Sequence, residues 1–231
     1  MCSFAQQTKN TLIMKKTFIK ILFLSAISLT LVNCKDKAKE ATTTEAEEVA
    51  EVEAEALKFT ADTLASTIEW KGFKPTGSHN GVINLERGVI NTVDGEIAGG
   101  TFLIDMSSIS VLDIPAEEKD HAKLTGHLKS PDFFDVEAHP NAAFEITGLE
   151  EVEGKMMLSG NLTLKDATNN VTFPVSVSNE GDAMTLTSET FTIDRSKWNV
   201  KYGSKSFFDN LGDKFINDDI ELKIMLKATK A

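Results

Sequence analysis

Cysteine is almost absent from this chain, which has only Cys2 and Cys34 in 231 residues. Cys2 lies upstream of the cleavage point expected below, so a mature protein would keep one thiol and could form no internal disulfide. With that thiol acylated, a thiolate metal ligand and a cysteine nucleophile are both excluded. The fold must therefore be held by a hydrophobic core and by strand hydrogen bonds.

Positive charge is also scarce, because 24 Lys and Arg stand against 35 Asp and Glu, a formal net charge of −11. Residues 1–33 contain four lysines and no acid, so their removal makes the protein still more acidic. A surface of this sign disfavours nucleic acid and anionic lipid head groups as partners. We expect no nucleic-acid partner.

The residue patterns of catalysis and metal binding are missing as well. His121 and His127 are six residues apart, on different helix faces, while His79 lies in a turn and His139 precedes a proline. No Gly-x-Ser-x-Gly motif marks a nucleophile on a strained turn. We expect no metal site, no cofactor and no enzymatic activity.

Long apolar runs are limited to Ile21–Leu31, which follows the basic segment Met14–Lys20. The run is too short to span a membrane and is typical of a secretory signal. It ends in Leu-Val-Asn-Cys, which resembles a bacterial lipobox. The alternative is a core helix with an incidental cysteine.

We predict that residues 1–33 are a signal segment, with Met14 as a second candidate for the true start. Cys34 is then the lipidated residue of an exported protein of the bacterial cell envelope. It would anchor the protein in a membrane, at the periplasmic face or in the outer membrane.

Residues 34–57 are rich in Lys, Glu, Thr and Ala and contain few large apolar side chains. Such a composition buries little surface, so we predict an acidic disordered tether. The alternative is a helix that packs on the folded domain, because Ala and Glu are good helix formers.

Apolar and polar residues alternate through most of residues 58–231, as in Asp219–Lys227 and Val171–Ser178. This period of two predicts strands with one dry and one wet face. The apolar phase slips between Leu186 and Phe191, which predicts a bulge near Ser188–Thr190. We therefore predict an all-β domain, an antiparallel β-barrel of about eight strands, because closure leaves no exposed edge.

Two segments lack this alternation. Pro115–Leu128 begins with proline and acidic residues, which favour a helix N-terminus. A second short helix is expected at Phe207–Phe215. Both fall in long connections, where a lid over a barrel mouth would lie.

Three stretches resemble the YceI-like family of lipocalin-like barrels. Gly126–Ile146 contains His-Leu-Lys-Ser-Pro-Asp-Phe-Phe-Asp before a strand, as the family signature does. Gly160–Val175 resembles the family hairpin, although Asp166 and Ala167 replace a frequent Gly. Phe191–Gly203 contains Arg-x-x-Trp-x-Val-x-Tyr-Gly, similar to a further family motif. The resemblance runs from about Phe59 to the C-terminus.

The resemblance implies a barrel that binds, carries or sequesters a long apolar molecule, such as an isoprenoid, quinone-like or fatty-acyl lipid. Strand phase and resemblance together predict a cavity lined by Phe102, Ile104, Leu162, Phe173, Phe191, Trp198 and Leu222. His127, Lys129 and Arg195 are candidates for polar groups at its mouth, each with an ordinary structural role as the alternative. The rival function is a lipid-anchored interaction or stress-protection module with a packed barrel and no ligand. The sequence leaves the oligomeric state open.

Overall fold

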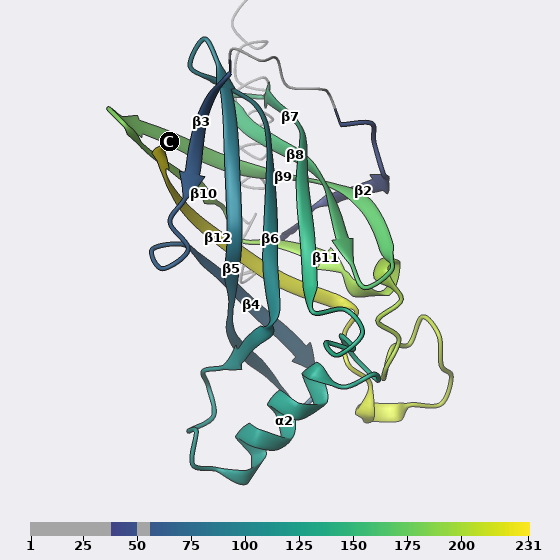
Figure 1. Ribbon diagram of the computed structural model, residues 1–231. Helices are drawn as coiled ribbons and strands as arrows, with labels where there is room; N and C mark the ends of the chain where they lie inside the picture. The colour runs from purple at the N-terminus through teal and green to yellow at the C-terminus, as the bar shows by residue number, and fades with distance from the viewer. Residues whose placement is uncertain (1–37, 50–55) are drawn as a thin grey trace, which may run out of the picture. The chain divides into compact units, whose positions relative to one another are not determined.

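The computed structural model describes residues 38–49 and 56–231, in which antiparallel strands form one closed ring (Figure 1). Neighbouring strands run in the order β5–β6–β7–β8–β9–β10–β12, and both β3 and β4 join β12 to β5. The predicted barrel of about eight strands is therefore confirmed. The strands of the ring are β3 (Leu57–Ala61), β4 (Thr67–Lys74), β5 (Gly77–Val93), β6 (Glu96–Val111), β7 (Asn141–Val152), β8 (Lys155–Leu164), β9 (Ala167–Glu180), β10 (Ala183–Ser188) and β12 (Asp219–Lys230).

The ring closes because β12 is long enough to take two partners in succession on one side. Its first half pairs with β4 from Ile220 to Met225, and its end pairs with β3 from Ala228 to Lys230. The long strand β5 makes the same division on the other side of β3 and β4. Two short strands thus stand where one would be expected, and the sheet has no free edge at this position.

The break between β10 and β11 (Phe191–Asp194) lies where the apolar phase slips. β10 pairs with both β9 and β12, whereas β11 pairs with β12 and not with β9. Pro174 lies in β9 just beyond the last residue paired with β10, where its missing N–H costs no ladder hydrogen bond. The change of direction leaves a seam between β9 and β11.

The N-terminal segment fills this seam, which corrects the prediction of a disordered tether for residues 38–49. β1 (Lys39–Glu40) pairs in parallel with β11, and β2 (Thr42–Glu45) pairs antiparallel with β9. Ala41 between them is buried, and its N–H donates to the Thr192 carbonyl at 2.8 Å. The segment packs on the barrel, but as strands and not as the helix that was the alternative.

The single α-helix of the described residues, α2 (Lys119–Lys129), lies in the connection from β6 to β7. It begins four residues later than Pro115, because Pro115–Glu118 forms a turn closed by a 3.0 Å hydrogen bond from the Glu118 N–H to the Pro115 carbonyl. Ser130 ends it, with Pro131 directly after. Leu128 is the buried residue that fixes the helix against the barrel.

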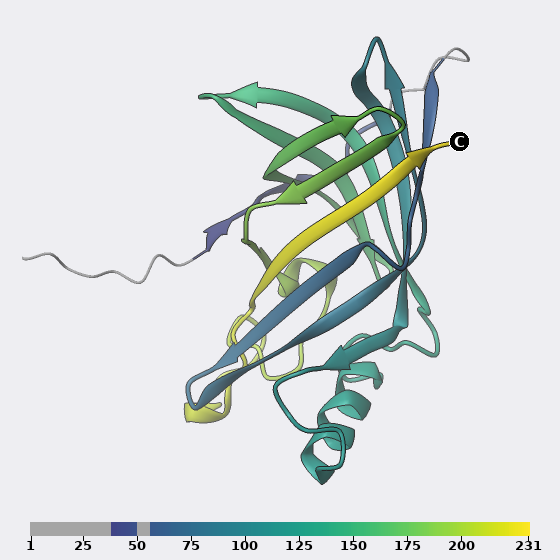
Figure 2. The ribbon, with the colours of Figure 1, turned by 90° about the vertical axis from the view of Figure 1, so that its left-hand side faces the viewer.

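The predicted second helix at Phe207–Phe215 is wrong. This part of the β11–β12 connection contains only a three-residue 3₁₀ turn, η2 (Gly212–Lys214), because Asn210 and Gly212 adopt positive φ angles that interrupt a helix. A four-residue 3₁₀ helix, η1 (Arg195–Trp198), forms earlier in the connection. Figures 1 and 2 show α2 and the β11–β12 connection together at the same end of the barrel.

No helix among residues 38–49 and 56–231 is long and apolar enough to cross a membrane.

Candidate functional site

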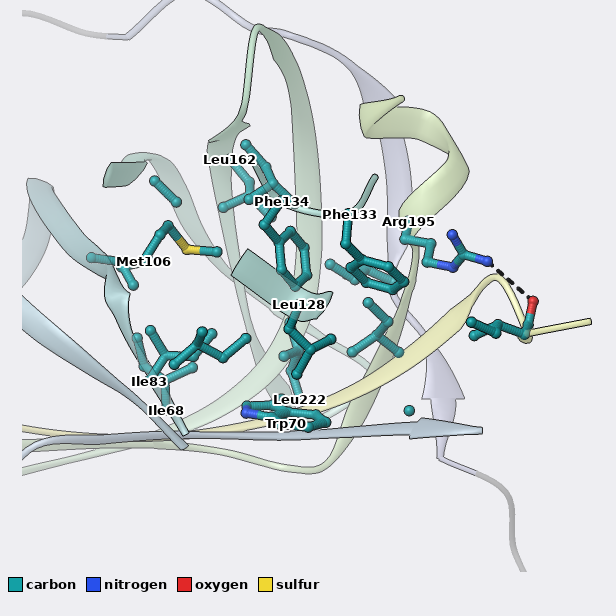
Figure 3. Close-up of a pocket in the computed structure, with 18 of the residues that line it drawn as sticks. Ile68, Trp70, Ile83, Met106, Leu128, Phe133, Phe134, Leu162, Arg195 and Leu222 are labelled. Atoms are coloured by element: carbon teal, nitrogen blue, oxygen red, sulfur yellow. Dashed lines mark hydrogen bonds between the residues drawn. The ribbon is translucent and has the colours of Figure 1, made fainter. Parts of the chain in front are cut away.

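An apolar cavity of about 120 Å³ opens inside the barrel beneath α2 and the β11–β12 connection. Figure 3 shows the rings of Phe133 and Phe134 on one side, the Trp70 indole on the opposite side, and the Leu128 side chain of α2 between them. Aliphatic side chains from the strands complete the wall. They include Ile68, Ile83, Ile104, Met106, Leu162, Ile193, Ile220 and Leu222.

A second apolar cavity of about 60 Å³ lies inside the same barrel. Ile68 and Ile104 line both cavities, so these two side chains form the wall that the two spaces share. Phe102, Phe144, Leu158 and Phe173 are among its other lining residues. The interior is therefore a divided apolar space and not one filled core.

Burial supports this description. Ile68, Ile104, Leu162 and Leu222 point to the interior but are only partly buried, whereas Ile90 and Phe191 are almost fully buried. Apolar side chains in a close-packed interior leave little surface accessible. Incomplete burial of inward side chains is what an accessible interior produces.

Five of the seven predicted lining residues border these cavities. Ile104, Leu162 and Leu222 line the larger cavity, and Phe102 and Phe173 line the smaller one. The strand alternation identified them, because every second residue of a barrel strand faces inward.

Phe191 and Trp198 lie outside the lining of both cavities. The Phe191 ring stacks on Phe173, with centroids 4.2 Å apart and planes 5° apart, so it backs a lining residue. Trp198 has no exposed surface, and its indole N–H donates to the Leu162 carbonyl at 2.8 Å. Both aromatic residues belong to the packed core. The alternation of inward and outward residues could not exclude them from the lining, because it is interrupted at the seam beside β11 and does not apply to the 3₁₀ helix η1.

Arg195 borders the larger cavity, but its guanidinium is fully engaged with the protein. It donates to the carbonyls of Val200 at 2.5 Å, Ile216 at 3.1 Å and Asn217 at 3.1 Å, and Asp218 Oδ1 lies 3.2 Å from Nη2. Figure 3 shows one of these hydrogen bonds, from the guanidinium to an oxygen of another residue that is drawn. Complete burial lowers the pKa of Arg195, although Asp218 and Asp194 oppose the shift.

The prediction of Arg195 as a polar group at the cavity mouth is therefore corrected. Its side chain is fully buried and ties η1 to the end of the β11–β12 connection. The cation also lies 5.2 Å from the Phe133 ring centroid, which holds that ring in the cavity wall.

His127 and Lys129 are on α2, and neither lines a cavity. His127 packs edge-on between the rings of Phe133 and Tyr202, with centroids 5.7 and 4.5 Å away. The Lys129 carbonyl accepts from the Val136 N–H at 3.0 Å, which closes the turn that contains Phe133 and Phe134. The structure therefore gives His127 and the Lys129 backbone packing roles near the cavity, and a role in ligand contact stays a prediction.

Gly160 and Gly100 do not leave open space in the barrel. Gly160 faces inward, but a Cβ added there would overlap the ring of Phe144. A Cβ on Gly100 would come within 2.7 Å of the Val89 carbonyl oxygen. These glycines allow close approach of neighbouring groups, and the open space lies elsewhere.

The predicted lining omits a second group of residues that border the larger cavity: Ile68, Trp70, Ile83, Leu128, Phe133 and Phe134. Ile68 and Trp70 alternate on β4, so strand phase could have found them. Phe133 and Phe134 follow α2 in a tight turn, with rings 5.0 Å apart, and both their place in the family signature and their pairing in a connection mark them.

Residues 38–49 and 56–231 hold no group of three His, Cys, Asp or Glu side chains arranged to bind a metal ion. Cys34 lies outside the described residues.

The fold matches that of known proteins. The solved structures similar to this chain include two with TM-scores above 0.5. Burkholderia cenocepacia BcnA has a TM-score of 0.57 and 22% identity, covering 73% of this chain and 99% of that one. A polyisoprenoid binding domain from Saccharophagus degradans, implicated in plant cell wall breakdown, has a TM-score of 0.56 and 16% identity, covering 76% and 99%. At these identities the likeness establishes the fold.

Curated relatives are similar over a shorter stretch. Protein YceI of Salmonella arizonae and that of Salmonella newport are each 29% identical over 89 residues, which is 36% of this chain and 47% of the relative. The matched stretch thus spans about half the length of these relatives. The model of the YceI-like domain family matches residues 59–228, almost the whole barrel. The chain therefore belongs to the YceI-like domain family.

Proposed function

We propose that the barrel binds a long apolar molecule, of the isoprenoid, quinone-like or fatty-acyl class, within the cell envelope. The observation that carries the proposal is the divided apolar space, whose lining side chains remain partly accessible although they face inward. The polyisoprenoid-binding name of the Saccharophagus degradans neighbour agrees with this ligand class.

Charge in the cavity wall is restricted to Arg195, and its guanidinium is consumed by three carbonyls and by Asp218. A charged substrate group would therefore find no free counter-ion in the larger cavity. Binding would instead be driven by removal of apolar surface from water, worth about 0.8 kcal/mol for each buried CH₂ group. This arrangement supports a carrier of an apolar molecule.

A long ligand needs more room than the two separate spaces provide, because ligand pockets usually measure about 300–1,000 Å³. Ile68 and Ile104 form the shared wall, so rotation of these two side chains would join the cavities into one channel. The proposal thus includes a rearrangement of this pair when the ligand enters.

We also propose that Cys34 is lipidated and keeps the barrel at a membrane of the envelope. Support comes from the sequence, where a basic segment, an apolar run and a lipobox-like tetrapeptide occur in the required order. Proximity to a membrane would give the barrel direct access to a ligand that water does not carry.

The rival function is an interaction module with a packed barrel, and the small volume of each cavity favours it. Lipid extraction and native mass spectrometry of the protein purified from its own host distinguish the two. The carrier predicts a co-purifying apolar molecule at a fixed stoichiometry. Recovery of the protein alone would favour the packed module.

A matched pair of substitutions sharpens this test. Ala142→Leu adds bulk to a residue of the cavity wall, and Ala228→Leu adds the same bulk to a buried core position outside both cavities. The carrier predicts that Ala142→Leu loses the bound molecule with little loss of stability. Ala228→Leu should lower the free energy of unfolding by about 1–3 kcal/mol, the usual cost of overpacking.

A further inference from the structure

The β11–β12 connection presents three large aromatic side chains to solvent at the α2 end of the barrel. Tyr202, Phe207 and Phe208 are 46%, 43% and 49% exposed. An exposed phenylalanine ring contributes little hydrophobic stabilisation to the fold. Clustered exposed apolar side chains commonly mark an interaction surface. The three residues lie within seven positions of the same connection.

This surface is basic in a protein that is otherwise acidic. No acidic residue occurs from Arg195 to Phe208, and Lys197, Lys201 and Lys205 are all exposed. The Lys201 ammonium lies 4.9 Å from the Phe207 ring centroid, and that of Lys205 lies 3.5 Å from the Phe215 centroid. Asp194 and the exposed Asp209 border this segment, so the positive charge is confined to the stretch between them, in a chain whose net charge is −11.

The connection is held firmly from beneath. Ser204 is fully buried, and its hydroxyl donates to Asp218 Oδ2 at 2.9 Å, which also accepts from the Ser206 hydroxyl at 2.6 Å. The Ile216 N–H donates to the Gly203 carbonyl at 2.8 Å. Because these bonds fix the backbone, the outward direction of Phe207 and Phe208 is set by the fold.

Aromatic contacts lead from this surface to the larger cavity. Tyr202 packs on His127, which packs on Phe133 of the cavity wall. Ile216 also lines the cavity and lies against Gly203 of the connection. Contacts therefore connect Tyr202 and Gly203 of the connection to residues of the cavity wall.

We propose that Tyr202, Phe207 and Phe208, with Lys197, Lys201 and Lys205, form a docking surface for the interface of a lipid bilayer that contains anionic head groups. Aromatic side chains favour the head-group level of a membrane, and lysine keeps its ammonium near phosphate while its stem lies on apolar groups. Docking in this way places the α2 end of the cavity against the membrane, so an apolar ligand could pass between bilayer and barrel without crossing water.

This use of the surface in ligand exchange rests on the proposed carrier function, but contact with the bilayer does not. The acidic character of the chain as a whole opposes binding to anionic membranes. Docking must therefore depend on Lys197, Lys201 and Lys205, and the proposal fails if these three lysines are not required.

Bromolipid quenching of a tryptophan placed on the surface tests the proposal. The full chain carrying Phe208→Trp is mixed with vesicles of phosphatidylglycerol and brominated phosphatidylcholine. Leu64→Trp is the control, because Leu64 is 98% exposed in the β3–β4 turn, away from the α2 end. The native Trp70 and Trp198 are buried and provide a common background.

The expected result is a blue shift and strong quenching for Phe208→Trp, with neither for Leu64→Trp. Quenching of both positions would show non-specific adsorption and overturn the proposal. Quenching of neither, or of Leu64→Trp alone, would also overturn it and leave the surface to a protein partner.

Charge reversal gives the second arm. Adding Lys201→Glu and Lys205→Glu to Phe208→Trp should abolish the quenching, and added salt should weaken it in the parent. Lys58→Glu with Lys230→Glu is the matched control, since both lysines are exposed where β3 meets the end of β12. Equal loss of quenching in the two double reversals would contradict a local surface.

The fluorescence measurement involves no cavity ligand. Loss of bilayer contact with a co-purifying lipid still present would reject only the docking surface. Bilayer contact without any co-purifying lipid would reject only the carrier.

Discussion

The side-chain amide of Asn161 makes two hydrogen bonds to the backbone of Glu47. Its Oδ1 accepts from the Glu47 N–H at 2.9 Å, and its Nδ2 donates to the Glu47 carbonyl at 2.7 Å. Asn170 donates to the same Oδ1 at 3.1 Å, so two buried asparagines cooperate. The Asn161 amide in β8 thus binds the N–H and the carbonyl of Glu47, the two backbone groups that a neighbouring β-strand would bind.

Asn161→Ala should therefore destabilise the barrel. The substitution removes both bonds to Glu47 and leaves the Asn170 amide without one acceptor, and such losses cost about 1–3 kcal/mol. Chemical denaturation measures the effect. The cost should shrink in a variant that begins at Leu57, because Glu47 is then absent. An equal cost in the two backgrounds would show that Asn161 stabilises the barrel independently of the segment.

The variant that begins at Leu57 should itself melt at a clearly lower temperature than the full chain. It loses the pairing of β1 with β11 and of β2 with β9, and it exposes the seam around Ala41. Thermal unfolding followed by circular dichroism tests this. Unchanged melting would return residues 38–49 to the role of a dispensable tether.

The strands of the ring were predictable, because one buried face imposes a period of two on each of them. The N-terminal strands were not, since Lys39–Glu45 has no apolar alternation and gains its order from unpaired groups of β9 and β11. Composition reports how much surface a segment can bury. It does not show that strands elsewhere in the chain have backbone groups free to pair with that segment.

The residues of the site likewise divide into those that the sequence predicts correctly and those that it does not. Ile104, Leu162 and Leu222 were found from strand phase. Arg195 was misassigned, because a sequence shows a charge but not the carbonyls that converge on it. The sequence also does not show that the position beside Gly160 is filled, because Phe144, whose ring occupies it, comes from the neighbouring strand β7.

Arg195→Leu should be among the most destabilising single substitutions. It leaves the carbonyls of Val200, Ile216 and Asn217 without this donor and Asp218 without its cation. Breaking a buried pair in this way costs about 3–5 kcal/mol in the free energy of unfolding. Urea denaturation measures it, with Arg87→Leu as the control, since Arg87 is 73% exposed and should change little. Similar costs for the two would refute a structural role for Arg195.

Gly160 and Phe144 should be energetically coupled. Gly160→Ala places a methyl group where the Phe144 ring lies, so we expect a loss of about 1–3 kcal/mol from overpacking. Phe144→Leu should recover part of that loss when the two are combined, because the shorter side chain vacates the position. A double-mutant cycle from denaturation curves gives the coupling. Strict additivity would mean that the two side chains do not compete for this space.

Cys34→Ala should release the protein from the membrane fraction. The reason is chemical, since a thioether-linked lipid needs the cysteine sulfur, and no described helix could hold the chain in a bilayer instead. Fractionation and immunoblotting of cells that express each form give the distribution. Cys2→Ala is the matched control and should remain membrane-bound, because Cys2 lies upstream of the expected cleavage point. Exported and cleaved Cys34→Ala protein that still sediments with membranes at high salt would reject the anchor. If only high salt released it, the basic docking surface at Lys197–Lys205 would account for the residual binding, since salt screens the attraction of lysine to phosphate but does not weaken an acyl chain in the bilayer.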